Sequence, residues 1–122
     1  MSTRYPNSFI YLASPYSDKD QNVVMERVRK TEVAVASYLK AGKIIFSPIL
    51  HCHELSINCK LPGDASFWWK FNRTMLMQAE ELWLLTLDGW QQSKGMKKES
   101  MLAIHHEIPV SHVHYAEVLI NA

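Results

Sequence analysis

The sequence has few of the features that define specialised classes of protein. It contains only two cysteines, Cys52 and Cys59, which are too few for a disulfide scaffold. No stretch approaches the ~20 consecutive apolar residues that span a bilayer. Residues 1–7 are polar and lack the apolar run of a secretory signal. We therefore expect a cytoplasmic protein that does not bind a membrane.

The sequence also lacks an excess of charge of either sign. Thirteen basic and twelve acidic side chains give a formal net charge of +1. The protein therefore has no overall field that would attract it to a nucleic acid polymer or to an anionic membrane. Neither is expected as a partner.

Two common nucleotide-binding signatures are absent as well. The chain contains no G-x-G-x-x-G and no G-x-x-x-x-G-K-[ST], which argues against a dinucleotide dehydrogenase and against a P-loop kinase. Repeats, low-complexity segments and linkers are also missing. With 122 residues, 48% of them hydrophobic, the chain fits a single domain over residues 1–122 with a sizeable core.

The sequence does contain short apolar runs that alternate with longer amphipathic segments. Strands are expected where runs of strand-forming residues end at turn signals or begin after one, at residues 9–13, 43–47, 82–87 and about 109–113. Helices are expected between them, at about residues 20–41, 64–79 and 94–106. Residues 48–63 are expected to form an irregular loop, with room for a short helix. The pattern at residues 116–122 favours no particular structure.

This β-α-β-α-β-α-β order predicts a doubly wound α/β fold of the flavodoxin or Rossmann kind. The expected sheet is short and parallel, with about four strands in the order 2-1-3-4 and helices on both faces. Ligands of such sheets bind outside the carboxyl ends of the strands, where the strand order reverses. Here the loops at residues 14–19, 47–64 and 88–94 build that edge, and they contain most of the chemically interesting residues.

The most informative segment follows the third expected strand and reads DGWQQSKGMKKE at residues 88–99. Ser93, Lys94 and Gly95 lie where a loop enters a helix, and the free N–H groups of a helix start can bind a phosphate. Glu99 follows about one turn later, where the helix dipole favours an ionised carboxylate. Such a carboxylate beside a phosphate could attack a sugar carbon. The spacing alone fits a simpler interpretation better, with Ser93 as an N-cap and Glu99 as an ordinary first-turn acid.

Three motifs taken together are similar to those of a known superfamily. They are IYLASPYS at residues 10–17, FSPI at residues 46–49 with His51, and LDGW at residues 87–90 followed by Ser93, Gly95 and Glu99. Over about residues 9–113 the chain resembles the nucleoside 2-deoxyribosyltransferase-like superfamily, and in particular its small bacterial and phage branch. The Ser-x-Gly-x-x-x-Glu element is the most specific part of this match.

The resemblance implies an N-glycosidase that acts on a nucleoside or a nucleoside 5′-monophosphate. Glu99 would be the nucleophile that attacks C1′, expels the base and forms a glycosyl-enzyme ester. Tyr11 would lie beside it, while Ser14, Ser93 and Gly95 would line the sugar or 5′-phosphate site. Hydrolysis by water is preferred over transfer to a second base because Ser93 and Gly95 offer a phosphate cradle. The proposed chemistry implies no metal or organic cofactor, and relatives that complete their pockets with a neighbouring subunit imply a homo-oligomer, a dimer or higher.

The acid that protonates the leaving base is a gap in this comparison. Relatives usually carry an Asp on the second helix where this chain has Asn72, which can hydrogen-bond a substrate but cannot carry a proton at neutral pH. Glycosidic cleavage normally needs a second acid. Asp64 and Asp88 are the remaining loop candidates, and each is also a common helix-cap or turn residue.

Other side chains in the same loops are candidates for substrate binding. Tyr16 follows the first strand, and His51 is expected to form a polar wall of the pocket. Trp90 or Trp69 is expected to stack on a base, whereas the helical spacing of Trp68 favours the core. The neighbouring histidines, cysteines and glutamate at residues 51–59 match no standard zinc spacing, so no metal site is expected.

Two interpretations from other functional classes remain open. The first is a non-catalytic nucleotide-binding module of the same fold, which the amide of Asn72 favours. The second is a structural or partner-binding domain with a vestigial pocket.

Overall fold

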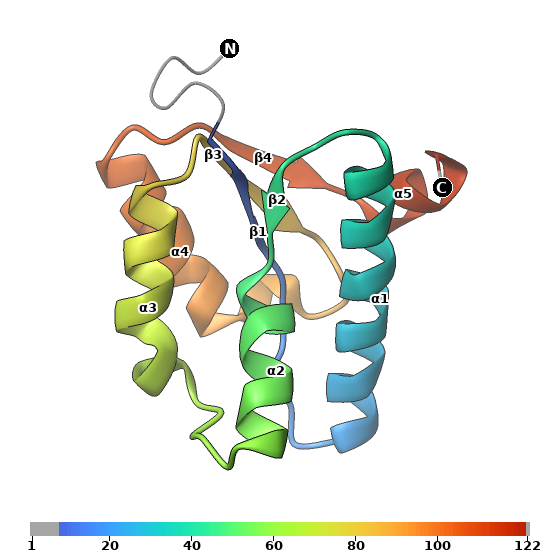
Figure 1. Ribbon diagram of the computed structural model, residues 1–122, viewed down its shortest axis with the longest axis vertical. Helices are drawn as coiled ribbons and strands as arrows, with labels where there is room; N and C mark the ends of the chain where they lie inside the picture. The colour runs from blue at the N-terminus through green and yellow to red at the C-terminus, as the bar shows by residue number, and fades with distance from the viewer. Residues whose placement is uncertain (1–7, 122) are drawn as a thin grey trace.

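Four short parallel strands form the centre of the structure, a computed structural model that describes residues 8–121 (Figure 1). They are β1 (Ile10–Ala13), β2 (Ile45–Phe46), β3 (Glu81–Leu85) and β4 (Val110–Val113), in the spatial order β2-β1-β3-β4. β1 pairs with β2 on one side and with β3 on the other. The predicted α/β fold and strand order are confirmed. The polar segment at residues 1–7 and residue 122 lie outside the described residues.

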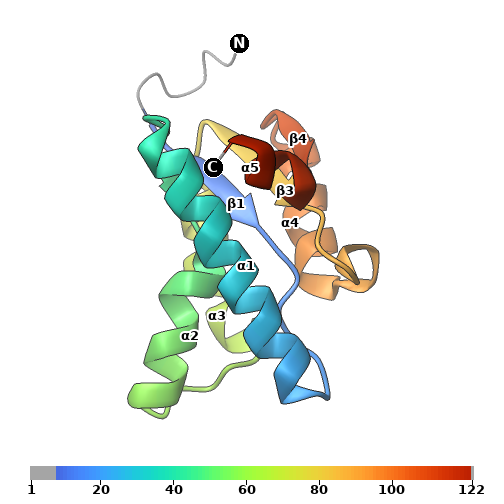
Figure 2. The same ribbon diagram turned by 90° about the vertical axis from the view of Figure 1, so that its right-hand side faces the viewer.

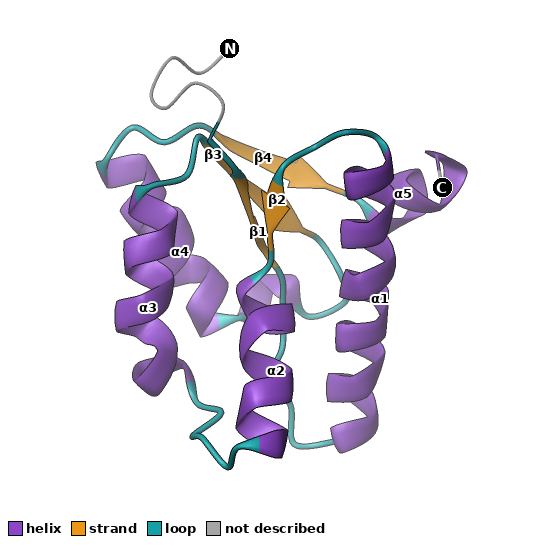
Figure 3. Cartoon of the chain, in the orientation of Figure 1, coloured by secondary structure: helices purple, strands orange, loops and turns teal. Residues whose placement is uncertain are grey.

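Helices connect the strands and follow the last one (Figure 3). Within residues 8–121 they are α1 (Gln21–Lys40), α2 (Pro48–Asn58), α3 (Ala65–Met77), α4 (Lys94–His105) and α5 (Tyr115–Asn121), with one turn of 3-10 helix, η1 (Trp90–Gln92). In this part of the chain no helix combines the length and the apolarity that crossing a membrane requires.

The two faces of the sheet bury different sets of side chains. Successive residues of a strand point to opposite faces, so Tyr11 and its neighbour Leu12 belong to separate clusters. On the Tyr11 face the core contains Leu76 of α3 and Ala103 of α4. The Leu12 face packs against α1 and α5, which lie side by side in front of the sheet in Figure 2. Tyr11 is therefore directed toward the helix that carries Glu99.

The segment after β2 is largely helical, so the predicted loop at residues 48–63 is wrong over most of its length. Ser47 caps α2 by accepting a hydrogen bond from the Leu50 N–H at 3.2 Å, and Pro48 occupies the first helical turn, where proline is favoured. α2 extends past the carboxyl ends of the strands, together with the first half of α1 and of α3 (Figure 1). These three helices surround the edge of the sheet at which the sequence predicts a ligand.

Candidate active site

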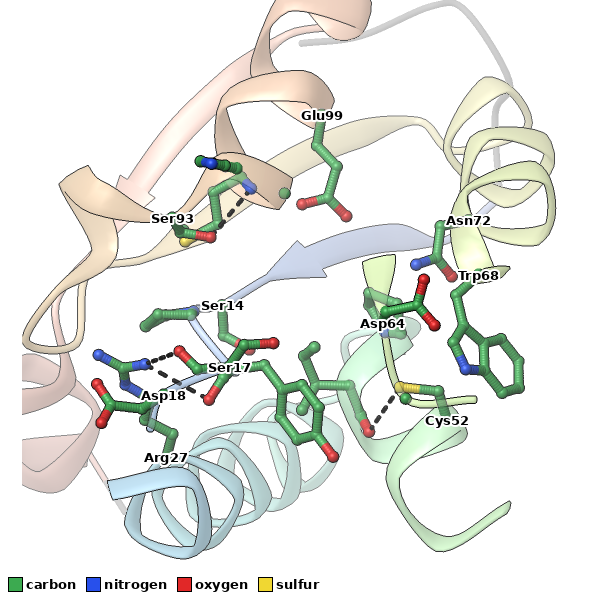
Figure 4. Close-up of a pocket in the computed structure, with 18 of the residues that line it drawn as sticks. Ser14, Ser17, Asp18, Arg27, Cys52, Asp64, Trp68, Asn72, Ser93 and Glu99 are labelled. Carbon is green, nitrogen blue, oxygen red and sulfur yellow. Dashed lines mark hydrogen bonds between the residues drawn. The ribbon is translucent and has the colours of Figure 1, made fainter. Parts of the chain in front are cut away.

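A cavity of about 590 Å³ lies at the carboxyl edge of the sheet. Its walls come from the loop after β1, the first half of α2, the loop into α3, α3 itself and the segment from β3 into α4 (Figure 4). The strand order reverses between β1 and β3, which is where open α/β sheets bind ligands. The volume falls within the range of about 300–1,000 Å³ that is typical of small-molecule pockets.

Glu99 lines this cavity although its side chain is almost completely buried. It lies on the inner stripe of α4 with Met96 and Ala103, positions that a helix normally fills with apolar residues. The Tyr11 hydroxyl donates a hydrogen bond to Oε2 of Glu99 over 2.5 Å. A carboxyl group on the apolar stripe is costly for folding, so its presence beside a cavity indicates a functional group.

The electrostatics of this pair place the titration of Glu99 near neutral pH. Burial raises the pKa of Glu99 from 4.5 to about 7, and the hydrogen bond from Tyr11 opposes that rise. The pKa of Tyr11 is well above 10, because the ring is buried and the Glu99 carboxylate disfavours a second negative charge. The Tyr11 hydroxyl therefore stays protonated and donates a hydrogen bond. Glu99 supplies a carboxylate that becomes fully ionised above neutral pH.

The N-terminus of α4 forms one end of the cavity. Ser93 is the N-cap and accepts a hydrogen bond from the Met96 N–H at 3.2 Å. Ser93, Lys94 and Gly95 all line the cavity, as the sequence predicts for an anion site at this point.

Arg27 of α1 lines the same end of the cavity and was missed by the sequence analysis. Its guanidinium donates to the carbonyl oxygens of Ser17 at 2.9 Å and Asp88 at 3.1 Å, so it joins the loops that follow β1 and β3. The Nε atom of Arg27 is buried without a hydrogen-bond partner. Gly89 has φ +87°, and a Cβ atom there would collide with this guanidinium. The absence of a side chain at Gly89 thus permits the Arg27 guanidinium to lie against the backbone of this loop.

The other end of the cavity carries Trp68 and Asn72, four residues apart on one face of α3, and Asp64 at the start of that helix (Figure 4). Trp68 is buried, and its Nε1 donates to the Pro62 carbonyl at 2.8 Å, which fixes the indole ring. The Oδ1 atom of Asn72 is buried and has no hydrogen-bond partner. Trp68, expected in the core, is thus the tryptophan that lines the cavity.

Asp64 lines the cavity but is poorly suited to donate a proton. Its carboxylate is exposed and accepts a hydrogen bond from the Ser66 hydroxyl. This hydrogen bond lowers the pKa of Asp64 below its usual value. The group is therefore ionised at neutral pH, where a general acid must be protonated.

Three further polar side chains complete the walls. Ser14 is buried and accepts a hydrogen bond from the Thr31 hydroxyl at 3.4 Å. The Tyr16 hydroxyl shares a hydrogen bond of 2.8 Å with Nδ1 of His53. Burial raises the pKa of Cys52 to about 11, so this residue remains a thiol at neutral pH and not a nucleophile.

Besides Tyr11, which is fully buried and bonded to Glu99, three predicted site residues do not line the cavity. The Asp88 side chain is exposed, and this residue contributes its backbone carbonyl to Arg27. His51 is exposed on α2 and stacks on the Phe71 ring at 4.8 Å between ring centroids.

Trp90 is the third of these residues. Its ring packs edge-to-face on His112 at 5.3 Å, away from the cavity lining. Trp69, the other expected stacking residue, lies under the Lys98 ammonium group at 4.3 Å and is not part of the lining either. The roles predicted for Asp88, His51 and Trp90 were therefore wrong in position.

Metal ligation finds no support in the part of the chain that the structure describes. No group of three or more His, Cys, Asp or Glu side chains there could hold a metal ion. Cys52 is buried and Cys59 is exposed, and both are free thiols.

The place of Arg27 at the cavity could have been predicted from the sequence by a general rule of parallel sheets. A helix that follows a parallel strand runs back along the sheet, so its first two turns lie at the carboxyl edge. Arg27 is in the second turn of α1 and directly precedes the buried Val28. A basic residue next to the inner stripe at that place is a candidate for the ligand site.

Comparison with known proteins identifies a family but no activity. No curated protein matches the chain. One family of domains, described as a domain of unknown function, matches residues 8–115, a segment that includes all four strands and every residue of the cavity. The chain belongs to this family, DUF1937.

Proposed function

We propose that the protein is an N-glycosidase that cleaves the bond between base and sugar in a nucleoside 5′-monophosphate or a nucleoside. The observation that carries this proposal is the buried Glu99 carboxyl group, which faces the cavity and is held by the Tyr11 hydroxyl. The motifs shared with the nucleoside 2-deoxyribosyltransferase-like superfamily support the same activity and give Glu99 the role of nucleophile.

In the proposed reaction, ionised Glu99 attacks C1′ and the bond from C1′ to the base nitrogen breaks. The resulting glycosyl-enzyme ester is then hydrolysed by water. Tyr11 holds one carboxylate oxygen through its hydrogen bond, which leaves Oε1 as the attacking atom. The buried surroundings keep the carboxylate poorly solvated, which makes it more reactive than an exposed one.

Hydrolysis of a 5′-monophosphate is preferred over base exchange because of the end of the cavity at α4. Lys94 and Gly95 offer backbone N–H groups for a phosphate, and Ser93 offers its hydroxyl, since its own N–H donates to the Trp90 carbonyl. The Lys94 ammonium group and Arg27 add positive charge. Sugar and base then extend toward Asn72 and the indole ring on α3. The scheme uses no metal or organic cofactor.

We also infer a cytoplasmic homo-oligomer. The low cysteine content supports the location. Exposed apolar side chains on α3 and α4 support self-association, with Phe67 at 48%, Met101 at 71% and Ile104 at 70% exposure.

The second candidate function is a nucleotide-binding module without catalysis. Asn72 favours it, because an amide at this wall can bind a nucleotide but cannot protonate a leaving base. In that case Glu99 has no catalytic role, and its substitution leaves nucleotide binding intact.

Release of free base, followed by liquid chromatography, tests the proposal. A panel of nucleosides and 5′-monophosphates, in ribose and deoxyribose forms, is incubated with the wild type, with Glu99→Gln and with Glu32→Gln. Glu32 is an exposed glutamate of α1, so its substitution makes the same change in charge away from the cavity.

We expect release by the wild type and Glu32→Gln and a loss of at least roughly 1,000-fold in Glu99→Gln, since that variant lacks the nucleophile. Nucleotide binding without release, at equal affinity in all three proteins, would favour the binding module. Neither release nor binding with any compound would refute both candidates.

A further inference from the structure

The proposed function leaves one step without a group to perform it. A neutral base leaves as an anion unless a proton reaches it, and glycosidases supply that proton from a second carboxylic acid. The titratable side chains that line the cavity are Tyr16, Asp18, Arg27, Cys52, Asp64, Lys94 and Glu99. Glu99 is taken by the attack on C1′, which leaves Asp18 and Asp64 as carboxylic acids.

Neither aspartate is suited to donate a proton to the base, Asp18 because of its position and Asp64 because its ionised form is stabilised. Asp18 lies at the Arg27 end of the cavity, and its Oδ1 accepts a hydrogen bond from the Asp20 N–H at 2.9 Å (Figure 4). Asp64 lies at the opposite end, and the hydrogen bond from Ser66 stabilises its ionised form. Both carboxylates therefore accept hydrogen bonds from neighbouring donors.

The wall beside the leaving base accepts hydrogen bonds and attracts positive charge. The Oδ1 atom of Asn72 has no donor partner, and Asp64 adds a carboxylate at the same end of the cavity. The indole of Trp68, fixed by its bond to the Pro62 carbonyl, lines the same end of the cavity, and the face of an indole ring attracts cations. Figure 4 shows Asn72, Trp68 and Asp64 on one side of Glu99, and Ser93 and Arg27 on the other.

The cavity is thus polarised along the direction that a nucleotide would take. At one end, Arg27 and Lys94 outweigh the single carboxylate of Asp18, and together with the N-terminus of α4 they favour an anion. Asp64, Asn72 and Trp68 favour a cation at the other. A substrate with a phosphate and a positively charged base matches both ends.

We propose that the substrate is a nucleotide whose base is already positively charged before cleavage, of the pyridinium or N7-alkylated purinium class, so that it leaves without a proton. This inference rests on the proposed N-glycosidase function and names the substrate class of the same site. The Asn72 amide is then part of a site for cationic bases and not a defect in a proton-donating one.

The chemistry balances without a further group. A Glu99 oxygen forms the bond to C1′ while the C1′–N bond breaks, and the electron pair of that bond neutralises the positive ring nitrogen. The base leaves as a neutral molecule. Water then bonds to C1′, the ester electron pair returns to Glu99, and one proton of the water passes to solvent.

The test compares nucleotides with neutral and with positively charged bases. The probes are GMP and 7-methyl-GMP, each with ribose and with deoxyribose, together with nicotinamide mononucleotide as a pyridinium. Release is corrected for spontaneous loss measured without protein. Because general acid catalysis contributes roughly 100-fold or more, we expect kcat/KM for 7-methyl-GMP to exceed that for GMP by at least that factor. We also expect release of nicotinamide.

The variant Asn72→Asp should show the complementary behaviour, with Asn72→Ala as the control for altered packing. The Oδ1 position of residue 72 is buried and the Asp64 carboxylate lies at the same end of the cavity. Both raise the pKa of an Asp at this position, so it should hold a proton and supply the missing acid. We expect Asn72→Asp to release the base of GMP at least roughly tenfold faster than the wild type, and Asn72→Ala to show no such acceleration. With 7-methyl-GMP, neither variant should be faster than the wild type.

The outcomes separate the inference from the function on which it rests. Cleavage of GMP and 7-methyl-GMP by the wild type at rates within about tenfold would overturn the cationic substrate class and leave the N-glycosidase intact. Release from no probe of either class, with nucleotide still bound, would overturn the proposed function itself. The comparison of wild-type rates holds even if a variant does not fold.

Discussion

Substitution of the buried Glu99 should make the protein more stable, and increasingly so as the pH rises. The pKa of Glu99 is about 7 in the folded protein, against 4.5 for an unperturbed glutamate. Because the pKa of Glu99 is higher in the folded than in the unfolded protein, the fold is favoured at low pH, where Glu99 is protonated. This contribution to the free energy of unfolding is lost as the pH rises toward and through about 7. With about 1.4 kcal/mol per pKa unit, ionisation of buried Glu99 costs about 3.5 kcal/mol at high pH.

The variant Glu99→Gln removes this cost because an amide does not ionise. Between about pH 5 and about pH 8.5, the free energy of unfolding of Glu99→Gln should rise relative to wild type by about 2.5 kcal/mol. In a domain of this size that corresponds to a change of roughly 10 °C in relative Tm. Any constant penalty from the new amide cancels, because only the change with pH is compared.

Urea unfolding of wild type, Glu99→Gln and Glu32→Gln across this pH range measures the effect. Glu32→Gln controls for the loss of one negative charge at an exposed site. A stability difference between wild type and Glu99→Gln that stays constant with pH would refute the raised pKa, and with it the buried state of the carboxylate.

Three further predictions concern the neighbours of Glu99 and the cavity walls. In Tyr11→Phe the pKa of Glu99 should rise further, because the hydrogen bond that is lost stabilises the carboxylate. The acidic limb of the pH–rate profile should therefore shift to higher pH, and an unshifted limb would contradict this role of Tyr11. Ser93→Ala should cost about 1 kcal/mol in urea unfolding through loss of the α4 cap, and should raise KM for a 5′-monophosphate more than for the matching nucleoside; equal changes would exclude a phosphate at α4. Gly89→Ala should lower the free energy of unfolding by more than about 1 kcal/mol, because φ +87° is strained for alanine and its Cβ meets Arg27; a neutral effect in thermal melts would show that the loop can move away.

The fold was predictable because its signals are local. Each strand is a short apolar run, and at least one α-helix lies between successive runs. These features fix the α/β class, the order 2-1-3-4 and the edge at which the cavity lies. α2 was missed because polar residues such as His51 and Glu54 obscure the Ser47–Pro48 helix start.

The site was only partly predictable because its side chains depend on which face of a helix is buried. Glu99, Ser93 and Gly95 could be placed, since the start of α4 was evident from the sequence. His51 could not, because a segment assigned as loop has no defined face; in α2 the buried positions are Pro48, Cys52 and His53, and His51 lies off that face.

Arg27 and Trp90 depend on contacts between distant segments. Arg27 is held at the cavity by hydrogen bonds to the carbonyl oxygens of Ser17 and Asp88, and Asp88 lies 61 residues away in the sequence. Trp90 is withdrawn from it by its contact with His112 on β4. The place of Arg27 in the second turn of α1 makes it a candidate from sequence, but neither the carbonyl groups that hold it nor the His112 contact of Trp90 can be inferred from neighbouring residues.

The bonds of Arg27 to two loops also bear on how readily the cavity accepts a ligand. Loops at the edge of a sheet are usually the most mobile part of a domain, and ordering them reduces the affinity of binding. Here one guanidinium joins the loop after β1 to the loop after β3 before any ligand arrives. Much of the entropic cost of ordering these two loops is therefore met during folding, and it does not reduce the affinity for a ligand.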